Sequence, residues 1–171
     1  MPTRLRPLHA LAVMFCFGMS AALAASGAWK FAIDRQDQPS LSYYDGNGKT
    51  VFYVGCGAHF AMWTVYPGAA KKDDEKASIT IANKKTSMDF AGAIDSGYAD
   101  GPPHATMFEQ PDLGYARDDP ELYETKWHEL ERKFFDLLDS GEPLTVSAEG
   151  RSYGLPAIKI PRWRQRFNKI C

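Results

Sequence analysis

The sequence lacks the short motifs that identify common enzyme classes. No H-E-x-x-H metalloprotease motif, C-x-x-C redox motif, G-x-S-x-G hydrolase motif or glycine-rich phosphate loop occurs in the 171 residues. Catalytic groups are assembled in space, so this lack alone does not exclude an enzyme. We expect a protein that uses no cofactor and no metal. A hydrolase or metal-dependent enzyme built from His59, His104 and nearby acids stays open as a less favoured alternative.

Long apolar runs and a strong net charge are also missing from most of the chain. Beyond residue 24 no apolar run approaches the roughly 18 residues of a membrane-spanning helix, so we predict no transmembrane span there. The formal net charge is −1, and it falls to −3 when Arg4 and Arg6 are left out. A weakly acidic chain is a poor general nucleic-acid binder, because that affinity depends on neutralising phosphates.

Residues 1–24 have the three parts of a cleavable signal peptide. Arg4 and Arg6 form the positive end, an apolar run covers 10–19, and Ala22 and Ala24 form a small-x-small cleavage site. We therefore predict an exported protein, periplasmic or secreted, whose residues 25–171 form a single domain. The hydrophobic content of 44% is ordinary for a globular domain.

Cysteine is scarce: the chain has three, and Cys16 would leave with the signal. Cys56 and Cys171 then form an even pair in an oxidising compartment, and a structural disulfide between them is the simplest expectation. It would close a loop of more than about 100 residues. A redox pair or thiol nucleophile is the open alternative.

The hydrophobic pattern predicts an α+β fold. Strands are expected at 29–33, 41–44, 50–54, 59–66, 78–82, 88–90 and 144–148, with hairpin turns at Asp45–Gly48 and Asn83–Lys85. This gives an antiparallel meander of five to seven strands. A long amphipathic helix is expected to begin at Asp118–Pro120 and to end before Gly141, and a short helix follows Pro161.

The segment 96–117 is rich in glycine and proline and is predicted to be one long irregular loop. Loops of this length often bind a partner. Its candidate binding residues are Tyr98, His104, Phe108 and Tyr115. The alternative is that the loop folds over the sheet and buries its own aromatic side chains.

The charge changes sign along the last third of the chain. Residues 109–142 contain 11 acidic and 4 basic residues, whereas residues 149–171 contain 1 acidic and 6 basic residues. We expect the acidic helix to lie near the basic one. The alternative is a free basic face that attracts anionic envelope polymers.

Residues 147–153 read S-A-E-G-R-S-Y and have the form S-A-x-G-x-x-Y. This motif resembles the inhibitory motif of the membrane-bound and periplasmic C-type lysozyme inhibitors, which are small exported bacterial proteins. The resemblance covers seven residues and implies that Ser147, Gly150 and Tyr153 enter the lysozyme active-site cleft. The chain departs from that family by its added long helix and by the place of the motif near the C-terminus. A strand ending in a Glu-Gly turn explains the same residues structurally.

These observations favour a small exported, non-catalytic protein that binds an unknown protein or another component of the cell envelope. The first alternative is a periplasmic lysozyme inhibitor that uses the loop Ser147–Tyr153.

Overall fold

The computed structural model describes residues 27–56, 59–65, 74–94, 105–108, 118–148 and 150–169. The predicted signal segment 1–24 lies outside them. The elements in chain order are β1 (Ala28–Ile33), β2 (Pro39–Tyr44), β3 (Thr50–Cys56), β4 (Phe60–Val65), β5 (Lys76–Ala82), β6 (Ser87–Ile94), β7 (Ala105–Phe108), α1 (Pro120–Leu138), β8 (Leu144–Ala148), β9 (Arg151–Leu155) and α2 (Trp163–Asn168). Neither helix in this part of the chain is long and apolar enough to cross a membrane.

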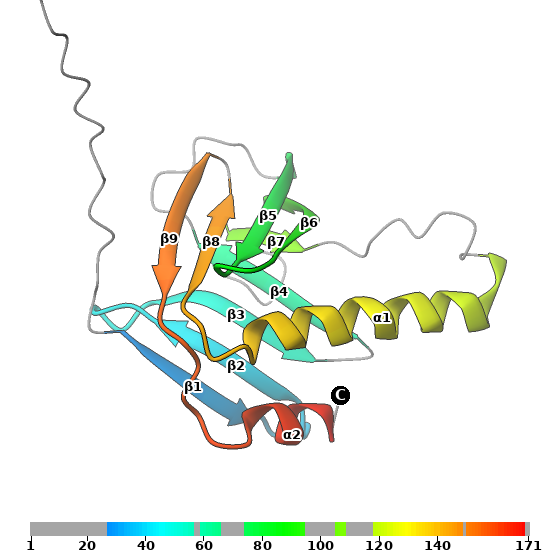
Figure 1. Cartoon of the computed structure of the whole chain (residues 1–171), viewed down its shortest axis with the longest axis horizontal. Helices are drawn as coiled ribbons and strands as arrows, with labels where there is room; N and C mark the ends of the chain where they lie inside the picture. The colour runs from blue at the N-terminus through cyan, green and yellow to red at the C-terminus, as the bar shows by residue number, and fades with distance from the viewer. Residues whose placement is uncertain are drawn as a thin grey trace, which may run out of the picture.

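All nine strands belong to one antiparallel sheet with the order β1-β2-β3-β4-β7-β6-β5-β8-β9. The first four strands are consecutive neighbours, as a meander requires. After β4 the order changes, because β7 lies between β4 and β6 and β8 lies beside β5. Figure 1 shows the two halves of the sheet, with α1 lying across them and α2 beside β1 and β2.

Long-range hydrogen bonds hold the sheet in a curled shape. The indole Nε1 of Trp29 in β1 donates to the carbonyl of Pro156, just after β9, at 2.7 Å. The Tyr153 hydroxyl in β9 donates to the carbonyl of Val51 in β3 at 3.0 Å and also contacts the hydroxyl of Thr64 in β4. Strands from opposite ends of the strand order therefore come together.

The prediction of an antiparallel sheet with two helices is confirmed, but the predicted count of five to seven strands is wrong. One additional strand is β7, which lies inside the segment expected to be an irregular loop. It has only four residues, too few to show an alternating pattern, and it pairs with both β4 and β6. The other is β9, which the turn at Gly150 folds back onto β8.

Two predicted hairpins form because polar side chains stabilise their turns. Asp45 Oδ1 accepts the backbone N–H groups of Asn47 and Lys49, each at 2.9 Å, and Gly48 has the positive φ of +74° that favours glycine. The backbone hydrogen bond from Lys49 is the main reason that the pKa of Asp45 lies below its ordinary value. In the β5–β6 turn, Asn83 Oδ1 accepts the N–H groups of Lys85 and Thr86.

Helix α1 agrees closely with its sequence signals. Asp119 is the N-cap, and its carboxylate accepts the backbone N–H of Leu122 at 3.1 Å. Pro120 occupies the first turn, where its missing N–H does no harm. The predicted apolar stripe is buried or half-buried against the sheet. Its fully buried members include Trp127, Phe134 and Leu137.

The core between α1 and the sheet is aromatic. Phe60 of β4 is at its centre, with its ring stacked on Phe134 of α1 at 4.8 Å and on Phe108 of β7 at 5.2 Å. Phe90 of β6 meets both Phe60 and Phe134 edge to face. Such ring pairs add about 0.5–1.5 kcal/mol each beyond the area they bury.

Helix α2 packs on the same core through Trp163 and Phe167, which are 2% and 0% exposed. Cys56, at the end of β3, belongs to this core as well and is 6% exposed. Cys171 lies outside the described residues. The disulfide between Cys56 and Cys171 therefore stays a prediction, and the packing of the C-terminal helix beside the core that contains Cys56 agrees with it.

Candidate functional site

Strands β5, β6, β8 and β9 have two contrasting faces. The inner face carries large apolar residues such as Ile79, Ile81 and Val146, which are buried in the core with α1. The strand register places small or short polar residues on most of the outer face, all exposed or half-buried; the exception in the described strands is Lys76 at the start of β5, which is exposed on the same side. We call this outer surface the hydroxyl face; it consists of Ser78, Thr80, Ala82, Ser87, Asp89, Ala91, Thr145, Ser147, Ser152 and Gly154.

Four of these residues form one row that runs across the strands. Asp89, Thr80, Ser147 and Ser152 are successive register partners in β6, β5, β8 and β9. The Thr80 hydroxyl donates to the Asp89 carboxylate at 2.5 Å, and the two serine hydroxyls are 2.6 Å apart. Adjacent strands are about 4.8 Å apart, so the row presents two close pairs of polar oxygens, one on β5 and β6 and one on β8 and β9.

The residues of the predicted lysozyme-inhibitor motif lie in the β8–β9 hairpin. Ser147 belongs to the hydroxyl face, and Gly150 is exposed in the turn with a φ of +71°. Figure 1 shows this turn at the end of the molecule remote from α2. The Tyr153 side chain points the other way, and its hydroxyl bonds to β3 and β4 inside the curled sheet. The motif is therefore divided between the two faces of the hairpin.

The predicted binding loop is described only in part. Tyr98, His104 and Tyr115 lie outside the described residues. Phe108 belongs to β7, where its half-buried ring stacks on Phe60 and meets Phe90 at 5.3 Å. For Phe108 the structure matches the alternative in which the segment buries its own aromatic side chains.

His59, which precedes β4, lies flat on the indole of Trp127, with 4.3 Å between ring centroids and 4° between the planes. Its Nδ1 lies 3.6 Å from Glu131 Oε1 and its Nε2 lies 3.9 Å from Glu124 Oε1. The other oxygen of Glu131 is 3.4 Å from Nδ1 of His128. One carboxylate is thus fixed between two imidazoles.

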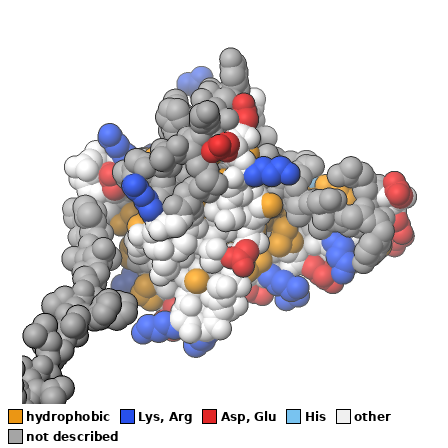
Figure 2. All heavy atoms as spheres, turned by 90° about the horizontal axis from the view of Figure 1, so that it is seen from above, with side chains coloured by type: hydrophobic (Ala, Val, Ile, Leu, Met, Phe, Trp, Pro, Cys, Tyr) orange, Lys and Arg blue, Asp and Glu red, His pale blue; other side chains and the backbone are white. Residues whose placement is uncertain are grey.

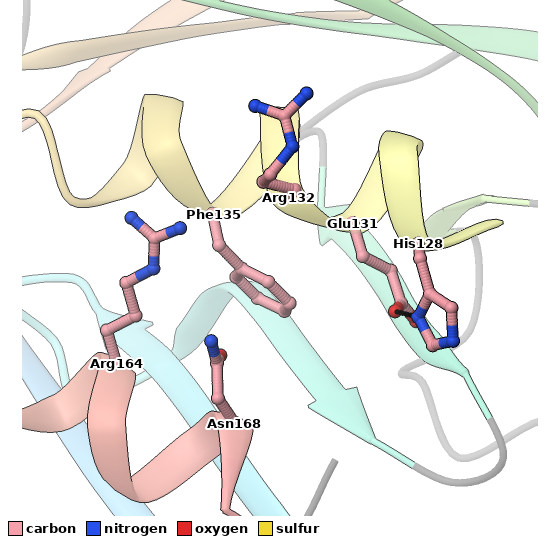
Figure 3. Close-up of a pocket in the computed structure, with 6 residues that line it drawn as sticks. All are labelled: His128, Glu131, Arg132, Phe135, Arg164 and Asn168. Atoms are coloured by element: carbon pink, nitrogen blue, oxygen red, sulfur yellow. Dashed lines mark ion pairs between the residues drawn. The ribbon is translucent and has the colours of Figure 1, made fainter. Parts of the chain in front are cut away.

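A hollow of about 260 Å³ lies between α1 and α2 next to this carboxylate. Figure 3 shows Phe135 and Asn168 projecting into the space between the helices. Arg164 stands on one side, and Glu131 with His128 stands at the other end. Arg164 also confirms the expected contact of the acidic and basic helices, since its guanidinium lies 2.6 Å from Asp136 and 3.8 Å from Asp139.

Among the described residues no three His, Cys, Asp or Glu side chains are arranged to hold a metal ion. The enzyme hypothesis named His59 and His104 as partners. His59 is instead placed between two glutamates, and His104 lies outside the described part of the chain. The His59 surroundings are those of an oriented ion-pair cluster on α1.

Charge and apolar surface are dispersed on the side of the molecule that Figure 2 shows. Lys and Arg side chains alternate there with Asp and Glu, and the visible hydrophobic side chains form only small separate groups.

Sequence reasoning missed the hydroxyl face and the hollow for different reasons. In the sequence, the small residues of β5, β6, β8 and β9 look like ordinary solvent-facing strand positions. Only the strand register shows that they lie side by side. For the hollow, the spacing of Glu124, His128 and Glu131 at four and three residues was an available signal, because such residues share one helix face. Arg164 is 33 positions further along the chain, so no local pattern connects it to them.

Comparisons with protein-family models, with curated proteins and with solved structures found no significant match.

Proposed function

We propose that this chain is an exported, non-catalytic binding protein of the cell envelope, and that the hydroxyl face is its binding surface. The partner that best fits is a neutral, hydroxyl-bearing polymer such as the glycan backbone of peptidoglycan. The observation that carries the proposal is the row Asp89, Thr80, Ser147 and Ser152, whose neighbours on the hydroxyl face all have short side chains, with Lys76 at the margin of the face.

Small side chains favour such binding for an entropic reason. A long lysine or glutamate loses up to about 2 kcal/mol of rotamer freedom when a partner covers it, whereas alanine and glycine lose none. The row also offers both donors and acceptors, since hydroxyl groups do both and Asp89 accepts. Asp89 is the charged residue of the hydroxyl face as defined, and its carboxylate already accepts the Thr80 hydroxyl, so a neutral polymer that docks there replaces only part of its hydration.

The test is co-sedimentation of the mature protein with purified, insoluble peptidoglycan sacculi. The double variant Thr145→Lys/Ser152→Lys places two long cations on the exposed part of the hydroxyl face. We expect its affinity for sacculi to fall at least about tenfold, because those charges must be desolvated. Thr125→Lys, a single Thr-to-Lys change on an exposed position of α1, is the control for added positive charge outside the face and is expected to bind like the wild type. Equal sedimentation of all three proteins, or none by the wild type, would contradict the proposal.

A second candidate, inhibition of lysozyme, is favoured by the exposed turn at Gly150. Ser147 and Ser152 lie at the base of this turn, and the positive φ of Gly150 makes it tight. A narrow hairpin end of this kind suits an enzyme cleft better than a flat surface. In this version Tyr153 anchors the hairpin from inside and does not itself touch the enzyme.

Inhibition assays with C-type and goose-type lysozymes test this candidate. Inhibition of the C-type enzyme that is lost in Gly150→Val and kept in Thr125→Lys supports it. Absence of inhibition at micromolar protein removes it and leaves the glycan-binding proposal unaffected.

A further inference from the structure

The hollow between α1 and α2 has groups of opposite charge at its two ends. Its lining consists of His128, Glu131, Arg132, Phe135, Arg164 and Asn168. Glu131 lies near one end and Arg164 near the other, while the phenyl ring of Phe135 and the amide of Asn168 lie between them (Figure 3). This arrangement is independent of the hydroxyl face.

The acidic end is held in place before any ligand arrives. The Glu131 side chain is only 15% exposed, and His59 and His128 lie 3.6 and 3.4 Å from its two oxygens. A carboxylate has about four lone-pair sites, so two neighbours leave acceptor capacity for a cation. His59 is itself fixed by stacking on Trp127.

The basic end is similarly oriented. Arg164 is 26% exposed and lies within 4 Å of both Asp136 and Asp139. Arg132, also on the lining, lies 3.6 Å from Asp136. A guanidinium has five N–H donors in a planar fork, so Arg164 retains donors for a second carboxylate beside those that face Asp136 and Asp139.

We propose that this hollow binds a small zwitterion, namely a free amino acid or a dipeptide. The ligand carboxylate would lie at Arg164 with Asn168 beside it, and the ligand ammonium would lie at Glu131. The aliphatic part would pass over Phe135. The size agrees, since about 260 Å³ is below the roughly 300–1,000 Å³ of sites for drug-sized ligands.

Isothermal titration calorimetry with alanyl-alanine tests the proposal, with N-acetyl-alanyl-alanine and alanyl-alanine amide as probes that each lack one charge. We expect the unmodified dipeptide to bind with a Kd of about 1 mM or tighter. Each blocked probe is expected to bind at least about tenfold more weakly, because one charged group of the site is left without a partner.

Two charge-neutralising variants test which end of the hollow binds the ammonium of the dipeptide and which end binds its carboxylate. Glu131→Gln is expected to weaken the binding of alanyl-alanine about tenfold and to leave the binding of the N-acetylated probe, which has no ammonium, unchanged. Arg164→Gln is expected to weaken alanyl-alanine by a similar factor and to leave the amide probe, which has no carboxylate, unchanged. Glu129→Gln on α1 and Arg162→Gln at the N-cap of α2, which remove the same charges outside the lining, are the controls.

Several results would overturn the inference. One is the absence of any heat of binding at about 10 mM dipeptide. Another is equal affinity for all three probes, and a third is an equal loss of affinity in the lining variants and in their controls. Circular dichroism of each variant separates loss of binding from loss of folding. Sacculus binding is measured on the same proteins, so this inference and the glycan-binding proposal fail or hold separately.

Discussion

Strands β5, β6, β8 and β9 share one strand register but carry different residues on their two faces. The inner face packs isoleucine, leucine, valine and phenylalanine side chains against α1, and these side chains are almost fully buried. The outer face alternates with it residue by residue and carries hydroxyl groups, alanine and glycine.

The contrast separates stability from binding. Burial of apolar area stabilises a fold by about 25 cal/mol per Å², and the inner face has nearly all of that area in this region. The outer face contributes little to packing, yet from Ser78 to Ala82 and at their register partners it carries no long charged side chain, although one would be harmless there; Lys76 lies at its margin. We interpret it as shaped by contact with a partner, and each of the following predictions tests that contrast.

The largest effect is expected from truncating the inner face. Phe134→Ala removes a ring that is 0% exposed and that contacts both Phe60 and Phe90. We expect the free energy of unfolding to fall by about 3–5 kcal/mol, measured by urea denaturation monitored by circular dichroism. A loss below about 1 kcal/mol would mean that α1 does not form the core described here.

The next largest effect concerns the predicted disulfide at the edge of the same core. Mass spectrometry of the mature protein after alkylation should find no free thiol. The double variant Cys56→Ala/Cys171→Ala should lower the free energy of unfolding by about 2–4 kcal/mol, because the unfolded chain is no longer cross-linked. Two alkylated cysteines in the native protein would contradict both the disulfide and the predicted oxidising compartment.

Two hydroxyl deletions in β9 compare the faces directly. Tyr153→Phe removes an inward hydroxyl that bonds to Val51 and contacts Thr64, and we expect a loss of about 1–2 kcal/mol in the free energy of unfolding. Ser152→Ala removes the adjacent outward hydroxyl, which bonds only to Ser147 among the described contacts. Its effect should stay within about 0.5 kcal/mol. Equal losses would remove the distinction between the faces.

An equally small effect on stability is expected for the variant that should weaken sacculus binding. Thr145→Lys/Ser152→Lys changes two exposed positions without filling the core, so its free energy of unfolding should remain within about 0.5 kcal/mol of the wild type. The same urea titration measures it. A loss as large as that of Phe134→Ala would show that the outer face is structural and that weaker sacculus binding reflects unfolding.

Local signals predicted those elements whose stabilising contacts are close in sequence. The α1 cap at Asp119 and the stripe from Tyr123 to Leu137 followed from spacing alone, and so did the turns at Asp45 and Asn83. Strand β7 was missed because four residues between glycine- and proline-rich stretches have no period of their own. Its strand conformation depends on β4 and β6, which pair with it on either side.

The candidate sites were also only partly predictable, because most of their residues come from segments that are distant in the sequence. Ser147 and Gly150 were found through a motif, but their neighbours Thr80 and Asp89 come from other strands and only the register aligns them. Glu131 and Arg164 line the same hollow because α1 and α2 pack on one core.

The sequence by itself determined the helix boundaries, the turns and the alternation of strand residues, because each depends on hydrogen bonds and side-chain periods within a few residues. The tertiary structure alone decided the strand order, the row of hydroxyl groups and the charged hollow. These features join residues tens of positions apart, and only burial of the shared aromatic core brings those residues together.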